Sequence, residues 1–75
     1  MDEKAVFVKE YLQPLLKAAI GNVAECSYQR AESGRECVNV RMAFTDDHDV
    51  ICNIDVTGDS LISMAADVIR VMQFK

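Results

Sequence analysis

Residues 36–56 read ECVNVRMAFTDDHDVICNIDV, and this stretch decides the fold. Two runs within it, Glu36 to Phe44 and Val50 to Val56, alternate apolar and polar side chains. A period of two is typical of β-strands with one buried face, because successive side chains of a strand point to opposite faces. The run Thr45 to Asp49 between them is short and polar, so we predict an antiparallel hairpin.

The alternation assigns a face to every residue of the two predicted strands. We expect eight side chains to be buried together: Val38, Val40, Met42, Phe44, Val50, Cys52, Ile54 and Val56. Asn39, Arg41, Asn53 and Asp55 take the opposite face. A register shift of one residue would turn the whole apolar set to solvent, so the register is strongly specified.

A third strand precedes the hairpin. Val23 to Arg30 alternates in the same way, with Cys26 on the apolar face, and residues 31–35 form a turn that contains Gly34. Short connections favour pairing of consecutive strands. The three strands are therefore predicted to form an antiparallel meander.

The N-terminal segment has the pattern of an amphipathic helix from Asp2 to Ile20, with Gly21 as its stop. Its apolar residues recur every three or four positions: Ala5, Val8, Leu12, Leu15, Leu16 and Ala19. Pro14 removes one intrahelical hydrogen bond and crowds the carbonyl of Glu10. Both residues lie toward the polar side, so we predict one helix with a kink near residues 10–14.

The C-terminal segment carries the signals of a second helix. Asp59 is the predicted N-cap, with Thr57 as the alternative. One face of the helix is apolar: Leu61, Met64, Ala65, Val68, Ile69 and Met72. Ile62 and Val71 widen this face beyond the stripe of a typical surface helix, which indicates that something covers its flank.

These elements predict an α+β fold in one domain, residues 1–75. The architecture is a two-layer αβββα domain, a three-stranded antiparallel meander with both helices packed on its apolar face. Cys26, Cys37 and Cys52 are odd in number and form no CxxC pair, so we expect reduced cysteines.

Charge and hydropathy exclude several classes of protein. Twelve acidic and eight basic residues give a net charge of −4, which disfavours direct binding to nucleic acid. The longest apolar runs are only a few residues, far short of a membrane span, so no membrane association is expected. The N-terminal Met-Asp-Glu-Lys lacks the features of a signal peptide, and we expect a cytoplasmic protein.

The sequence offers no evident catalytic or metal site. His48 lies among Asp46, Asp47 and Asp49, but their spacing does not match an EF-hand loop, and a polar hairpin tip explains them as well. The cysteines lie in predicted strands away from His48, so no nucleophile–base–orienter set is evident. We therefore expect no enzyme activity, no metal and no cofactor.

The αβββα order resembles that of the double-stranded-RNA-binding domain over the whole chain. That family contacts phosphates through lysines at the start of its second helix, where this chain has Gly58, Asp59, Ser60 and Ser63. We therefore carry over none of its binding residues and none of its activity. The turn 56–60 followed by an amphipathic helix resembles short reading frames of bacterial mobile elements, and the topology and acidity are similar to phage-encoded inhibitors of CRISPR nucleases.

Two functional hypotheses follow. The first is a small non-catalytic protein-interaction module that uses the surplus apolar residues Val6, Ile62 and Val71 along the helices, or a sheet edge, with a homodimer as the simplest case. The margins of a small core explain those residues equally well. The second is an acidic mimic of nucleic acid that inhibits a DNA- or RNA-binding protein through Asp46, Asp47 and Asp49, as proteins of phage or mobile elements do.

Overall fold

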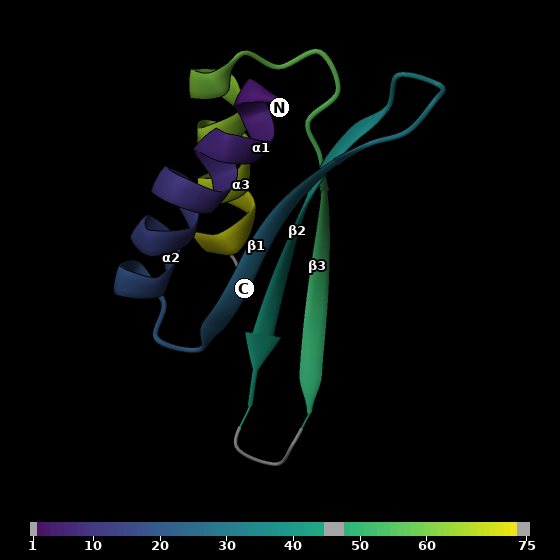
Figure 1. Ribbon diagram of the computed structural model, residues 1–75. Helices are drawn as coiled ribbons and strands as arrows, with labels where there is room; N and C mark the ends of the chain where they lie inside the picture. Colours follow the sequence, from purple (N-terminus) through teal and green to yellow (C-terminus); the bar gives the residue numbers. More distant parts are fainter. Residues whose placement is uncertain (1, 45–47, 74–75) are drawn as a thin grey trace.

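A computed structural model of the chain describes residues 2–44 and 48–73 (Figure 1). The elements follow in the order α1 (Glu3–Phe7), η1 (Val8–Leu12), α2 (Gln13–Ala19), β1 (Val23–Arg30), β2 (Glu36–Ala43), β3 (Asp49–Asp55) and α3 (Leu61–Gln73). The strands form one antiparallel sheet in the order β1-β2-β3. The predicted α+β fold with a three-stranded meander is confirmed.

The central strand β2 shows the predicted alternation. Val38 and Val40 are fully buried, whereas Asn39 and Arg41 on the other face are partly exposed. Val40 pairs with Cys26 of β1 and Cys52 of β3, so the inward residues of the three strands form continuous rows. All three cysteines are free thiols, as predicted.

The helices lie together on one side of the sheet in Figure 1, and they supply the other half of the core. The first helical segments contribute Val8, Leu12 and Leu16, and α3 contributes Met64, Val68 and Met72, all in one buried cluster with the inward strand residues. At about 25 cal/mol per Å² of apolar surface, this shared burial is the main stabilising contribution in so small a domain.

Phe44 departs from the predicted core. β2 ends at Ala43, and the Phe44 side chain is 42% exposed. Its backbone N–H donates to the carbonyl oxygen of His48 at 3.0 Å, and its ring lies 6.4 Å from the His48 ring. The residue therefore belongs to the end of the β2–β3 hairpin, beyond the layer that the helices cover.

The first helix is continuous from Glu3 to Ala19, but its middle is π-helical. The Gln13 N–H donates to the carbonyl of Val8, five residues earlier, and Pro14 follows with no N–H to continue the ladder. The irregularity thus lies where Pro14 predicted it. The effect of this irregularity on the core was not predicted. Leu12 and Leu16, four residues apart, are both buried, whereas Leu15, which was predicted on the apolar face, is 51% exposed.

Two predicted helix boundaries were wrong. The first helix ends with Ile20 in an extended conformation, and Gly21 is not among the glycines with positive φ. The N-cap of α3 is Ser60, whose Oγ accepts the N–H of Ser63 at 3.2 Å, and not Asp59. The side chain of Thr57, the alternative cap, instead bonds to the backbone of Glu36.

Candidate functional site

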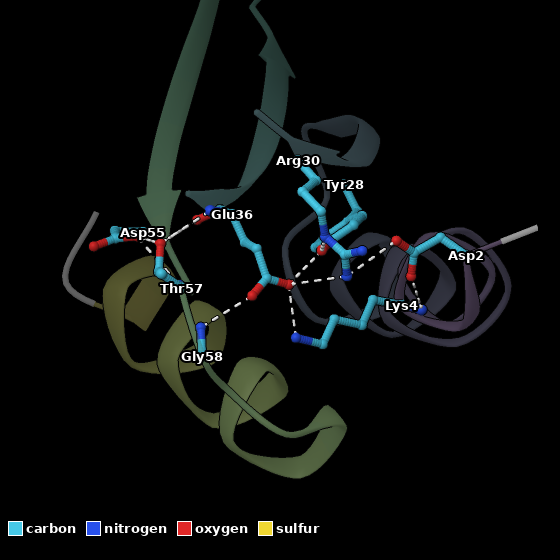
Figure 2. Close-up of polar contacts among 8 residues, drawn as sticks. All are labelled: Asp2, Lys4, Tyr28, Arg30, Glu36, Asp55, Thr57 and Gly58. Atoms are coloured by element: carbon cyan, nitrogen blue, oxygen red, sulfur yellow. Dashed lines mark hydrogen bonds and ion pairs between the residues drawn. The ribbon is translucent and has the colours of Figure 1, made fainter. Parts of the chain in front are cut away.

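A buried carboxylate at the start of β2 joins three separate parts of the chain. Glu36 is 7% exposed, and Figure 2 shows donors around both of its oxygens. Oε2 accepts from Lys4 Nζ at 2.6 Å and from the Tyr28 hydroxyl, and Oε1 accepts from the Gly58 N–H at 3.0 Å. The first helix, the β1–β2 hairpin and the turn before α3 therefore meet at one side chain.

A second set of contacts surrounds this carboxylate. Arg30 Nη2 lies 3.6 Å from Glu36 Oε2 and 3.2 Å from Asp2 Oδ2, and Arg30 Nε donates to the Tyr28 hydroxyl at 3.1 Å. On the backbone, the Glu36 N–H donates to Thr57 Oγ1 at 2.9 Å (Figure 2). Every charge in the cluster thus has an opposite charge or a donor beside it, as burial requires.

These contacts favour the ionised form of the Glu36 carboxyl. Hydrogen bonds from Lys4, Tyr28 and Gly58 lower the pKa of its carboxyl to about 2, and the same contact with Glu36 raises the pKa of Lys4. Burial and the contact with Glu36 raise the pKa of Tyr28. A carboxylate with so low a pKa is a weak proton acceptor near neutral pH, so the arrangement favours a structural tie over acid–base catalysis.

Sequence reasoning missed this cluster, although one signal was present. Glu36 lies two and four positions before Val38 and Val40, so the strand alternation places its charged side chain on the same inward face. A buried charge needs a partner, and Tyr28 and Arg30 share that face of the neighbouring strand. The contribution of Lys4, thirty-two residues away in sequence, has no such signal.

The outer edge of β1 is covered. The Cys26 N–H donates to the side-chain oxygen of Gln13 at 2.9 Å, and α1, η1 and α2 all contact this strand. The β1–β2 register also shifts between Val23 and Glu25, which marks a β-bulge. Gln13 directly follows the π-helical turn, and its side chain lies against the strand. Side-chain capping and a bulge are ways in which proteins block pairing at an edge.

The outer edge of β3 is open. The Val56 N–H donates to the Glu36 carbonyl, and antiparallel alternation then directs the backbone groups of Ile51, Asn53 and Asp55 away from β2. Among the described residues, no hydrogen-bond acceptor is found for these three N–H groups. The strand contains no lysine and no proline, and its register with β2 runs without a shift.

A groove of about 410 Å³ follows this open edge on the helix side. It lies between β3 and α3 and is lined by Asn53, Ile54, Asp55, Asp67, Arg70 and Val71. Arg70 forms an ion pair with Asp67 within α3. On the opposite face of the sheet, Ile51 is 62% exposed among polar neighbours. Each flank of the open edge thus presents one exposed apolar side chain, Val71 or Ile51, among polar neighbours.

The three residues predicted to form an interaction surface lie apart. Val71 lines the groove beside β3. Ile62, 84% exposed, lies nine residues earlier in α3, about two and a half turns, and therefore on roughly the opposite side of the helix. Val6 lies in α1, in a hollow with Ala5, Lys9 and Glu10. A separate apolar hollow between α2 and α3, lined chiefly by Leu15, Ala19, Ile69 and Met72, has a volume of about 340 Å³.

The predicted acidic tip is only partly described. Asp46 and Asp47 lie outside the described residues, so the mimic hypothesis stays a prediction. Asp49 is described, and its Oδ2 lies 3.5 Å from Arg41 Nη1. In the described ranges 2–44 and 48–73, no group of three or more His, Cys, Asp or Glu side chains is placed to hold a metal ion.

The geometry offers one open strand edge, one closed edge and one fully partnered carboxylate. No helix within residues 2–44 and 48–73 has both the length and the apolar character needed to cross a membrane. Comparisons with protein-family models, curated proteins and solved structures gave no match to this chain.

Proposed function

We propose that this chain is a small non-catalytic protein-interaction module that binds its partner by adding a strand to the open edge of β3. The single observation that carries the proposal is the row of outward N–H groups of Ile51, Asn53 and Asp55 on an edge without a bulge, a lysine or a proline. An added strand pairs with such a row through main-chain hydrogen bonds.

The surroundings of β3 give an added strand a place for both of its faces. Its side chains would alternate between the groove beside Val71 and the outer face beside Ile51. Main-chain bonds supply affinity in this mode of recognition, and the pockets for alternate side chains supply specificity. The fixed turn before α3 supports this arrangement, because Glu36 and Thr57 tie the end of β3 to the rest of the sheet.

The experiment compares two lysine substitutions at exposed positions on opposite edges. Ile51→Lys places a charge on the outer face of the open edge, and Gln29→Lys places the same charge on the outer face of the covered edge β1. Wild type and both variants serve as bait in lysate of the source organism, with quantitative mass spectrometry as the readout. Circular dichroism checks that each bait is folded.

We expect a set of proteins retained by wild type and by Gln29→Lys but lost with Ile51→Lys. A second, untagged copy of the chain counts as a member of this set. Equal retention by both variants would show that binding uses another surface. An empty set at high bait concentration would also overturn the proposal.

A further inference from the structure

We infer that the strand added to β3 is the β3 strand of a second copy of this chain, in a two-fold pair centred on Ile51. The inference rests on the proposed function and names the partner for the same edge. It follows from what the three registers with the greatest overlap of two antiparallel β3 strands would place side by side.

Only registers that face the outward N–H groups toward one another are allowed. A full overlap sets Asp49 opposite Asp55 of the second copy, twice, and like charges directly opposite are destabilising. A pair centred on Asn53 sets the apolar Ile51 opposite Asp55 of the second copy. The first of these registers sets like charges against each other, and the second sets an apolar side chain against a charged one.

The register centred on Ile51 avoids both conflicts. Ile51 then packs against its own copy, and Asp49 lies opposite the amide of the second copy's Asn53. On the helix side, Val50 lies opposite Cys52, so an apolar residue again meets an apolar residue. The pairing is isologous, because each contact occurs twice about the two-fold axis.

This register also accounts for the exposure of Ile51. The outer face of the sheet is otherwise polar along its central rows, with Ser27, Asn39 and Asn53 in one of them. Ile51 is the large aliphatic side chain on that face, at 62% exposure, and it lies on the strand whose edge is open. Pairing with its own copy removes this side chain from water and satisfies the outward N–H groups in one step.

The first test is sedimentation of the purified chain from about 10 μM to about 1 mM, the range in which small interfaces dissociate. We expect a reversible monomer–dimer equilibrium. Because each copy carries a net charge of −4, added salt should strengthen the dimer by screening repulsion. A strict monomer at the highest concentration would overturn the inference.

Three variants then test the surface and the register. Ile51→Lys sets lysine against lysine and should abolish the dimer, and Gln29→Lys should leave the dissociation constant unchanged. Asn53→Lys creates two Asp49–Lys pairs in the register centred on Ile51, and should tighten the dimer by about tenfold. In a pair centred on position 53 it sets lysine against lysine and weakens the dimer. Weaker association of Asn53→Lys, or a dimer that persists in Ile51→Lys, would overturn the inference.

The two proposals fail separately. A monomeric chain whose captured proteins are still lost with Ile51→Lys would refute self-pairing and keep strand addition with another partner. A dimer that survives Ile51→Lys, together with capture that is indifferent to it, would refute both.

Discussion

The two outer strands of the sheet have the same central neighbour but opposite edges. The free edge of β1 lies against the first helix, and the side-chain oxygen of Gln13 accepts a hydrogen bond from the N–H of Cys26. The free edge of β3 has a groove and an exposed isoleucine beside it. Figure 1 shows the difference: β1 lies beside α1 and α2, and β3 lies at the far side of the sheet.

This difference indicates which surface is available for recognition. An unpaired edge promotes association unless the fold blocks it, and proteins block edges with bulges, charges, proline or covering segments. The chain blocks one edge with a helix, a side-chain cap and a bulge. Within the described residues the other edge has no bulge, no proline and no covering helix, and its charges, Asp49 and Asp55, lie at the two ends of the strand. It is the surface that we propose to bind.

The largest expected effect comes from the strand that supports both edges. Val40→Ala in β2 should lower the free energy of unfolding by about 1–4 kcal/mol, through lost burial and a residual cavity. Asn39→Ala, one residue earlier on the open face, should cost about 0.5 kcal/mol or less. Chemical denaturation measures both values. A larger loss for Asn39 than for Val40 would contradict the assigned faces.

The second prediction concerns the tie between β1, β2 and the first helix. Glu36→Gln should lower the melting temperature at pH 7 by about 5–10 °C, because the charge-assisted contacts of Lys4 and Arg30 are lost. The folded-state pKa of Glu36, about 2, lies below the ordinary value of 4.5. Its stabilisation is therefore present above pH 4.5 and is lost as the pH falls toward 2.

Thermal melts of wild type and Glu36→Gln between pH 2 and pH 7 provide the measurement. The difference between the two proteins should shrink steadily below pH 4.5. A constant difference across this range would mean that the charge of Glu36 contributes nothing. Asp55→Asn is a comparison variant, because Asp55 also has a lowered pKa, caused by Thr57, but lies exposed.

The third prediction concerns the side-chain hydrogen bond that covers the edge of β1. Gln13→Ala removes the acceptor of the Cys26 N–H and should cost about 1 kcal/mol, with faster hydrogen exchange at that amide. Gln13→Glu replaces the side-chain amide oxygen with a carboxylate oxygen, which can also accept the hydrogen bond, and should keep the Cys26 N–H protected from exchange. Exchange followed by NMR reports both variants. Unchanged protection in Gln13→Ala would show that the helix backbone alone covers β1.

The smallest expected effect is on the stability of the open edge itself. Ile51→Lys should change the free energy of unfolding of the monomer by only about 0.5 kcal/mol, since the side chain is already exposed. Denaturation at low protein concentration isolates the monomer. A large loss would mean that Ile51 is part of the core, and the asymmetry between the two edges would then disappear.

Much of the fold was predictable from the sequence because one signal dominates each element. The alternation around Val40 fixed the faces of β2, and the amphipathic pattern of residues 61–73 fixed the inward side of α3. Phe44 was assigned wrongly because the alternation continues past the point where the helices cover the sheet. Asp59 and Ser60 are both good capping residues, and only the backbone geometry distinguishes them.

The candidate site was less predictable. Val6, Ile62 and Val71 were predicted to form an interface along the helices, and Ile62 and Val71 lie on different sides of α3. Their role in binding stays a prediction. The closure of β1 depends on where Gln13 points, which a single extra residue in the helical turn determines. Neither the meander order nor the composition contains that information.

The first helix is held to the sheet at two points, and the helix and β1 must span similar distances between them. Lys4 contacts Glu36, which pairs with Arg30, and Gln13 contacts Cys26. Lys4 and Gln13 are nine positions apart, or about 13 Å of helix, and Cys26 and Arg30 are four positions apart, or about 13 Å of strand. Helix and strand therefore span equal distances between the same two anchors. Inserting one residue into the α-helical part of this segment, residues 4–7, would rotate Lys4 by about 100° relative to Gln13, so the spacing tolerates substitution far better than a change of length.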